Sequence, residues 1–147
     1  MAAPSAWTLY HNFKLYLCDG TFDLNSNTFK VALVASGYTP VVATHAVLAD
    51  VTNELSTANG YTSGGVTVAA TLNLAAGTVT FDTADAAWTA SGGSIVARYA
   101  VLYASGTLNG RVNPLVAYCV LDSAPADVTA TATSTLTIQV TNILTLA

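Results

Sequence analysis

Carboxylate and amide side chains at alternate positions are the first feature of this sequence that could bind an ion. Asp23, Asn25 and Asn27 follow the spacing that opens a calcium-binding loop. That loop next requires a glycine and, at its last position, a bidentate glutamate, where this chain has Thr28 and Val34. The stretch therefore favours a polar turn over a metal site.

Histidines and glycine-rich stretches are the next candidates for chemistry. His11 and His45 lie in different segments, and neither has another His, a Cys or an acid at the spacing of a metal site or a catalytic triad. The stretches NGYTSGG and SGGS lack the glycine patterns of phosphate-binding loops. We therefore expect no catalytic, cofactor-binding or metal-binding residues, and a protein that is not an enzyme.

The two cysteines, Cys18 and Cys119, match no metal-binding spacing. Cys119 lies in the apolar run LVAYCVL, which favours a buried free thiol that packs as a small apolar side chain. A disulfide between the two cysteines is disfavoured.

A single arginine interrupts the apolar run SIVARYAVLY, which covers residues 94–103. Odd- and even-numbered residues of this run are both apolar, so both faces of the predicted strand are at least partly buried. Burying an unpaired guanidinium there would cost several kcal/mol of stability. Glu54, between apolar residues in DVTNEL, is our first choice of partner. We predict a structural Glu54–Arg98 ion pair that pins the irregular region 37–65 onto the sheet. In the alternative, Arg98 reaches the sheet edge and keeps its guanidinium in water.

Three glycines in NGYTSGG are assigned to turns rather than to ligand binding. Gly60 precedes Tyr61, and Gly64 and Gly65 lead directly into the predicted strand GVTVAA. Because glycine alone adopts positive φ freely, we expect Gly64 and Gly65 to allow a sharp turn into that strand.

The elements that must position these residues are mostly strands. Apolar residues at helical spacing predict a short helix that follows Ser5, a possible N-cap, and ends at Gly20. Thr44 could be the N-cap of one or two further helical turns. Strands are expected over residues 28–36, in a hairpin closed by Ala75, Ala76 and Gly77, and in the runs SIVARYAVLYAS, PLVAYCVLDS and STLTIQVTNILTL. The fold class is thus all-β or mainly β: an antiparallel β-sandwich or barrel-like domain with a short N-terminal helix, spanning residues 1–147 as one domain.

Composition excludes several classes of partner. Charged residues make up 8% of the 147 residues, hydrophobic residues 52%, and the net charge is −4. Four cations in all cannot neutralise many phosphates, so nucleic acid is not an expected partner. No apolar stretch approaches the roughly 20 residues that span a bilayer, so no membrane is expected. The start has no basic region ahead of an apolar block, which predicts synthesis in a cytoplasm without export.

The C-terminal run STLTIQVTNILTLA contains no charged residue. Edge strands are normally guarded by Lys, Pro or bulges, so an unguarded edge here predicts a homo-oligomer, a trimer or a dimer. The candidate contact segment comprises Asn142, Ile143, Leu144 and Leu146, with the loop 124–133 as a second possibility.

Several of these stretches together resemble a group of small virion proteins of tailed bacteriophages. Those proteins carry a VTNEV.GTGYT.GG stretch and a W...ITARYAVIY stretch, and the likeness covers most of the chain from about Phe13 onwards. The matching residues are Thr52, Asn53, Glu54, Gly60, Tyr61, Gly64, Gly65, Trp88, Arg98, Tyr99 and Tyr103.

The resemblance implies a structural virion protein that decorates or cements a phage capsid through protein–protein contacts. Its partners would be copies of itself and the phage major capsid protein, and its location the capsid exterior after synthesis in the host cytoplasm. The alternative is a tail-associated or receptor-binding module that recognises a glycan, for which Trp7, Trp88 and the tyrosines are the candidate contact residues.

Overall fold

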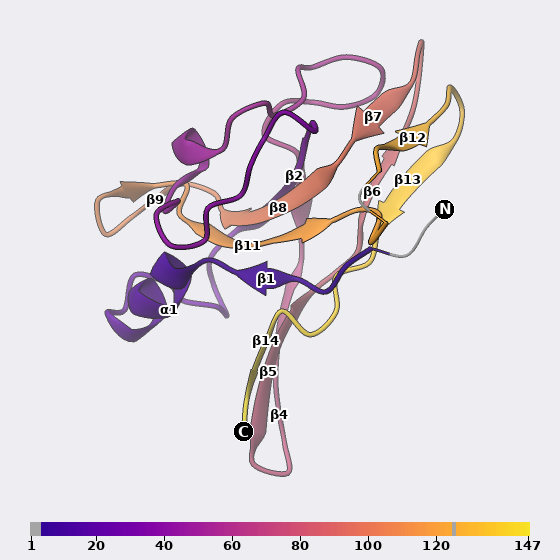
Figure 1. Ribbon diagram of the computed structural model, residues 1–147. Helices are drawn as coiled ribbons and strands as arrows, with labels where there is room; N and C mark the ends of the chain where they lie inside the picture. The colour runs from indigo at the N-terminus through magenta and orange to yellow at the C-terminus, as the bar shows by residue number, and fades with distance from the viewer. Residues whose placement is uncertain (1–3, 125) are drawn as a thin grey trace.

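A computed structural model describes residues 4–124 and 126–147 and confirms a mainly β fold with antiparallel sheets and a short N-terminal helix (Figure 1). In chain order the elements are β1 (Thr8–Leu9), α1 (His11–Cys18), β2 (Phe29–Val34), the 3-10 helix η1 (Leu48–Asp50), β3 (Val66–Val68), β4 (Ala70–Ala75), β5 (Thr78–Thr83), β6 (Ala86–Thr89), β7 (Ile95–Ala97), β8 (Tyr99–Ala104), β9 (Thr107–Leu108), β10 (Arg111–Val112), β11 (Leu115–Val120), β12 (Val128–Ala130), β13 (Thr135–Ile138) and β14 (Leu144–Leu146).

The largest sheet has the strand order β1-β11-β8-β2-β3, with every neighbouring pair antiparallel. Val31 of β2 lies opposite Leu102 of β8, and Thr8 of β1 lies opposite Tyr118 of β11. The three central strands β2, β8 and β11 are rich in Val, Leu, Tyr and Ala and are mostly buried. This is the pattern expected of strands that are covered on both faces.

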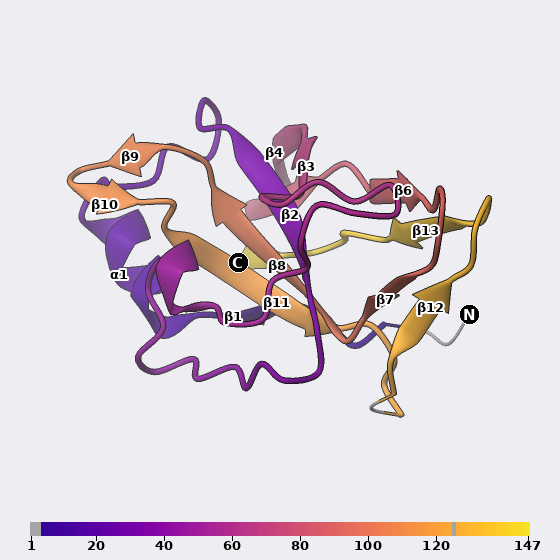
Figure 2. The ribbon, with the colours of Figure 1, turned by 90° about the horizontal axis from the view of Figure 1, so that it is seen from above.

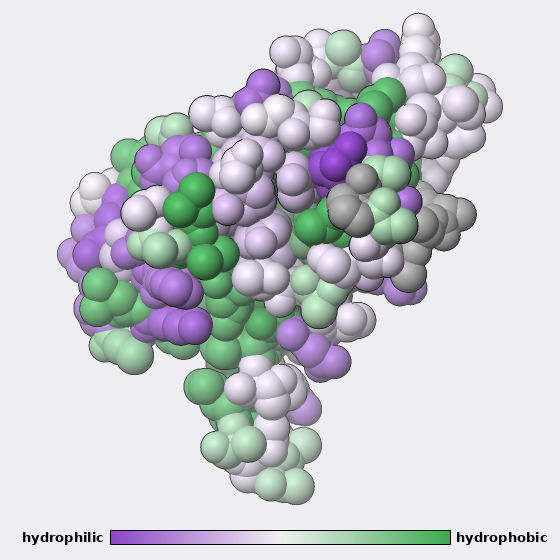
Figure 3. Space-filling model, viewed as in Figure 1, coloured by the Kyte–Doolittle hydropathy of each residue, from purple (hydrophilic) through white to green (hydrophobic). Residues whose placement is uncertain are grey.

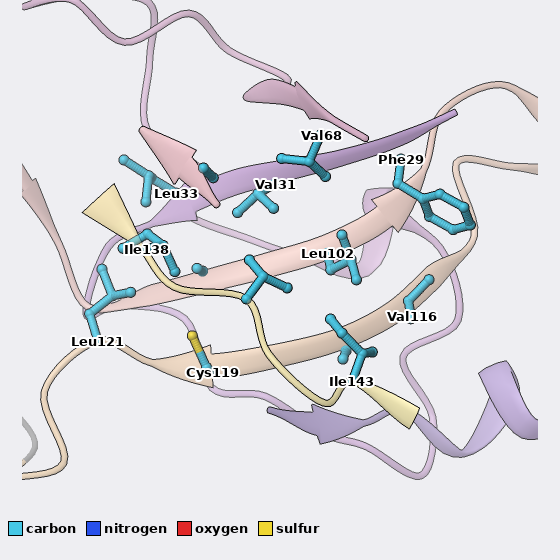
Figure 4. Close-up of a cluster of buried hydrophobic side chains, with 14 of the residues drawn as sticks. Phe29, Val31, Leu33, Val68, Leu102, Val116, Cys119, Leu121, Ile138 and Ile143 are labelled. Carbon is cyan, nitrogen blue, oxygen red and sulfur yellow. The ribbon is translucent and has the colours of Figure 1, made fainter. Parts of the chain in front are cut away.

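One face of this sheet packs against the second layer of strands (Figure 4). Val31, Leu33 and Leu102 share this core with Phe81 of β5 and Ile138 of β13. All five side chains are at most 3% exposed. The layered core expected of a sandwich is therefore present.

The opposite face is covered by the irregular segment that follows β2. Tyr38 and Val51 of that segment pack with Val34, Val101 and Leu115 of the sheet. Backbone pairing between Val34 and Glu54 holds the end of the segment against β2. The irregular region thus acts as the lid of a second, smaller core.

Three of the strands predicted from sequence are each divided in two. The run SIVARYAVLY breaks at Arg98, so that β7 pairs with β12 while β8 pairs with β2 and β11 (Figure 2). A break at Ala69 separates β3, which pairs with β2, from β4, which pairs with β5. The C-terminal run likewise separates into β13 and β14. Each break lets one extended chain segment contribute to two sheets.

The helix is shorter than predicted. It begins after Tyr10, which makes no side-chain capping bond, so Ser5 is not its N-cap. Ser5 instead extends the pairing of β1 with β11, because its backbone N–H donates to Val120 O at 2.8 Å and its Oγ accepts from Val120 N at 2.9 Å. Gly20, with φ +79°, ends the helix as predicted. Among the described residues no helix has the length and apolar character needed to cross a membrane.

Strands β4, β5 and β14 form a three-stranded sheet that projects from the rest of the molecule, and we call it the tongue (Figures 1 and 3). The predicted hairpin is confirmed: Ala75 pairs with Thr78 across Ala76 and Gly77, whose φ values are +49° and +80°. Two positive φ values in a two-residue loop are typical of a type I′ hairpin turn.

Candidate functional site

Glu54 is a hydrogen-bond acceptor within the fold and is not the partner of Arg98. Its Oε1 accepts a bond from the Tyr61 hydroxyl at 2.8 Å and another from the backbone N–H of Gly64. The Tyr61 hydroxyl in turn accepts from the N–H of Leu33 in β2 at 3.1 Å. The Glu54–Arg98 prediction is therefore wrong, although Glu54 does fasten the irregular region to the sheet, by hydrogen bonds rather than by an ion pair.

Tyr103 of β8 completes this arrangement by donating to Gly64 O at 2.7 Å. We call Glu54, Tyr61, Gly64 and Tyr103 the Glu54 clamp. Burial raises the pKa of Tyr61 well above that of a free phenol and raises the pKa of Tyr103 to about 12. Both phenols therefore stay protonated near neutral pH and remain able to donate to the clamp.

The predicted turn glycines are placed where a side chain would be strained. Gly60, Gly64 and Gly65 have φ values of +90°, +91° and +73°. A Cβ on Gly65 would lie 1.8 Å from Val31 O, and one on Gly60 would lie 2.2 Å from a backbone oxygen of β6. Gly60 and Gly65 let the chain pass directly against neighbouring strands, whereas Gly64 is strained only through its positive φ.

Arg98 lies at the break between β7 and β8, where its Nε contacts Asp127 Oδ1 at 2.8 Å. The two side chains are 22% and 40% exposed, so the pair is partly hydrated rather than buried. The Arg98 backbone donates to Val34 O and accepts from Leu121 N, both at 2.9 Å. Asp127 is available because it immediately precedes β12, the partner of β7. Arg98 thus stabilises the junction where the chain leaves the β7–β12 sheet and enters the five-stranded sheet as β8.

A second ion pair, not predicted from the sequence, joins the end of α1 to the β9–β10 hairpin. Arg111 Nη2 lies 3.3 Å from Asp19 Oδ2, and its guanidinium lies 4.0 Å from the centre of the Tyr16 ring. The hydroxyl of Thr21 donates to Asp19 and is the main reason that the pKa of this carboxyl lies below its usual value. The cluster attaches the hairpin to the helix.

The histidines do not meet in one site. His11 is exposed, whereas His45 Nδ1 lies 2.8 Å from the Tyr38 hydroxyl, which lies 2.8 Å from the hydroxyl of Tyr10. Next to His45 in the chain, the backbone N–H groups of Ala46 and Val47 donate to the Asp50 carboxylate, and these bonds lower the pKa of Asp50. No group of three or more His, Cys, Asp or Glu residues within the described part of the chain could hold a metal ion.

The alternating Asp and Asn residues after α1 form a self-contained turn. Asp23 Oδ1 accepts from Asn25 N at 3.0 Å and Ser26 N at 3.2 Å, and Asn27 Oδ1 accepts from Asp23 N at 2.8 Å. These bonds satisfy the turn locally, which agrees with the polar-turn assignment.

Both cysteines are free. Cys119 is fully buried and its pKa is raised by burial to about 12, while Cys18 is exposed. The interpretation of Cys119 as a packed thiol is confirmed.

Apolar side chains come to the surface on the tongue. Leu72 and Leu74 of β4 are 44% and 69% exposed, and Leu146 of β14 is 51% exposed. The strand register places them on one face with Val79 and Phe81, and Phe81 is fully buried in the core. This apolar face therefore begins in the core and continues beyond it into solvent, where it forms a candidate interaction surface.

The C-terminal contact segment is only partly available for contact. Ile143 is 3% exposed and belongs to the core, and Leu144 is half-buried against it, so these two side chains are structural. Asn142 and Leu146 are exposed. The sequence could not separate the two pairs because the chain turns at Asn142, where φ is +52°.

A hollow of about 400 Å³ lies where the N-terminal segment meets the C-terminal one. Trp7 lines it and donates from Nε1 to Gln139 O at 3.3 Å. Trp88, the other candidate for glycan contact, is 6% exposed, and the centre of its ring lies 6.0 Å from that of Tyr61.

No family model, curated protein or solved structure matches the chain, so its function has to be inferred from its own residues and geometry.

Proposed function

We propose that the chain is a structural virion protein that decorates or cements the head of a tailed phage. It would bind the major capsid protein and copies of itself through uncharged surface. The observation that carries the proposal is the tongue, a projecting sheet whose exposed apolar side chains Leu72, Leu74 and Leu146 extend outward from the core. Projecting apolar surface of this kind marks a site of protein contact.

The structural use of the matching sequence stretches supports the proposal. Glu54, Tyr61, Gly64 and Tyr103 belong to the stretches that resemble phage virion proteins, and all four are engaged in the Glu54 clamp. Low overall charge also supports a role in protein contact, because apolar and small polar surface can be buried without removing many charges from water.

Binding to phage heads tests the proposal directly. Heads assembled without this protein, from the major capsid protein of the phage that encodes it, would be mixed with the purified chain and sedimented. We expect the chain to co-sediment at a fixed ratio to the capsid protein and to raise the temperature at which heads release DNA. Failure to bind such heads at high micromolar concentration would reject a head role.

The hollow beside Trp7 favours a second candidate, a tail-associated module that recognises a host glycan. An indole next to the amide side chains of Gln139 and Asn142 supplies stacking and hydrogen-bonding groups of the kind that bind sugars. In this case the chain should bind host cells or isolated surface polysaccharide, and Trp7→Ala should abolish that binding.

A further inference from the structure

The outer edge of β4 is an unprotected strand edge. The tongue has the order β14-β5-β4, and no strand within residues 4–124 and 126–147 pairs with the outer side of β4. The register with β5 runs without a bulge from Ala70 opposite Thr83 to Ala75 opposite Thr78. The sequence ATLNLA contains neither a charge nor a proline, so none of the usual protections against strand addition is present.

The register identifies the backbone groups that face outward. Ala84 N donates to Ala69 O, and in an antiparallel pair the hydrogen-bonded positions recur at every second residue. Thr71 and Asn73 therefore direct their N–H and C=O groups to β5. The same groups of Ala70, Leu72 and Leu74 point away from β5 into open space.

From this edge we infer that β4 pairs with β4 of a second copy of the chain, antiparallel across a two-fold axis that passes beside Leu72. This inference deepens the self-association part of the proposed function and does not depend on the capsid contact. The pairing places Leu72 opposite Leu72 of the second copy, Leu74 opposite Ala70, and Asn73 opposite Thr71. The strand is thus complementary to itself: on the apolar face the two Leu72 side chains meet and Leu74 lies beside the smaller Ala70, and on the other face an amide lies beside a hydroxyl.

Charge and hydrophobicity both favour a second copy at this edge. Asp82 is the charged residue of the tongue strands, and it lies on β5, opposite Thr71, one strand inward from the edge. Like charges are therefore kept apart in the pair. The two apolar faces become one continuous face, so Leu72 and Leu74, now 44% and 69% exposed, gain neighbours from the second copy.

The size of the contact determines the kind of association expected. The contact consists of one backbone ladder of six residues and the side chains beside it. Its total buried area is therefore expected to fall below the roughly 1,200 Å² that separates weak from standard interfaces. The dimer should therefore be reversible, with a dissociation constant in the micromolar range, and should become stable where many copies are held side by side on one surface.

Sedimentation equilibrium over a concentration series tests the pairing. The wild-type chain should show a monomer–dimer equilibrium, and Leu72→Lys, which sets two ammonium groups opposite each other at the axis, should weaken it at least about tenfold. Leu146→Lys is the matched control, because it adds the same charge at an exposed leucine on the opposite edge of the tongue. A wild-type chain that stays monomeric at several hundred micromolar, or Leu72→Lys and Leu146→Lys variants that behave alike, would overturn the inference.

Cross-linking tests the register. In a Cys18→Ser background, Leu72→Cys should form a disulfide dimer under oxidised glutathione, because hydrogen-bonded antiparallel partners lie about 5.5 Å apart at Cα, within reach of a disulfide. Leu74→Cys, on the same strand and more exposed, should cross-link much more slowly because its partner position is Ala70. Equal or faster cross-linking at Leu74 would exclude this axis.

Head binding separates the two proposals. A wild-type chain that dimerises but binds no heads retains the β4 pairing alone, whereas a wild-type chain that binds heads but stays monomeric at several hundred micromolar retains the capsid role alone.

Discussion

Strands β8 and β4 are alike in length and lack of charge and lie in opposite environments. YAVLYA and ATLNLA are both six residues long and uncharged, yet β8 is largely buried whereas β4 is largely exposed. β8 lies between β2 and β11 and is covered on both faces, whereas β4 has β5 as its neighbour and ends a sheet. Burial is thus decided by what packs on a strand, and strand propensity alone does not distinguish a central strand from an edge.

The two regions also differ in how their backbone is held. The body, by which we mean the five-stranded sheet β1-β11-β8-β2-β3 and the segments packed on it, surrounds its central strands with side-chain bonds. Those of the Glu54 clamp, in which Tyr103 of β8 takes part, are an example. The tongue relies on its backbone ladder and on the packing of Phe81 into the core. Damage to the body should therefore unfold the whole molecule, whereas damage to the tip of the tongue should stay local.

The largest difference in the stability lost on substitution is expected between Gly65 and Gly77, two glycines with similar φ. In Gly65→Ala the new Cβ would meet Val31 O at 1.8 Å, so we expect the variant to lose several kcal/mol or fail to fold. Gly77→Ala at the tongue tip has φ +80° but no atom within 4 Å of the added Cβ, and should cost about 1–2 kcal/mol. Urea unfolding measures both; equal losses would contradict the contrast between body and tongue.

Truncation of one leucine in each strand gives the next largest difference. Leu102→Ala in β8 removes a fully buried side chain and should cost about 2–5 kcal/mol. Leu74→Ala in β4, 69% exposed, should cost less than about 0.5 kcal/mol. Thermal melts at low protein concentration provide the test, and a large loss for Leu74→Ala in the monomer would show that the tongue is part of the cooperative core.

Alkaline pH should destabilise the body through its buried phenols. The pKa values of Tyr61 and Tyr103 are raised from 10.0 in the folded state, Tyr103 to about 12. Their contribution to stability is complete below pH 10 and is lost as pH rises above it, because the unfolded chain then releases protons that the folded chain retains. Tm measured from pH 8 to 12 should fall above pH 10, and it should fall less steeply in Tyr103→Phe.

The Glu54 clamp should behave as one unit. Glu54→Leu and Tyr61→Phe should each cost about 1–3 kcal/mol, because each removes one partner and leaves the other incompletely bonded. The double variant should lose less than the sum of the single variants. Strict additivity in the urea-unfolding cycle would contradict a direct Glu54–Tyr61 bond.

The smallest effect is expected at Arg98. Its pair with Asp127 is partly hydrated, so Arg98→Met and Asp127→Asn should each cost about 1 kcal/mol or less. Adding salt should reduce the difference from wild type further. A loss above about 3 kcal/mol would instead indicate the buried pair that the sequence suggested.

Local patterns in the sequence predicted β2, the β4–β5 hairpin, β8 and β11, because each depends on residues close together in the chain. The partner of Arg98 could not be found in this way. The apolar flanks of Glu54 favour it as the partner, but in the structure its Oε1 accepts from Tyr61 and Gly64. Asp127 reaches Arg98 only because β12 pairs with β7. The strand breaks were missed for the same reason, since nothing local indicates that one apolar run serves two sheets.

The pairing of β1 with β11 bears on how the chain folds during synthesis. Thr8 lies opposite Tyr118, so β1 cannot pair until β11, more than a hundred residues later in the chain, has been synthesised. Closure over such a separation is slow, and during that interval the outer edge of β11 is open to other chains. A high rate of expression should therefore favour misassembly at this edge, and slower translation should raise the yield of native protein.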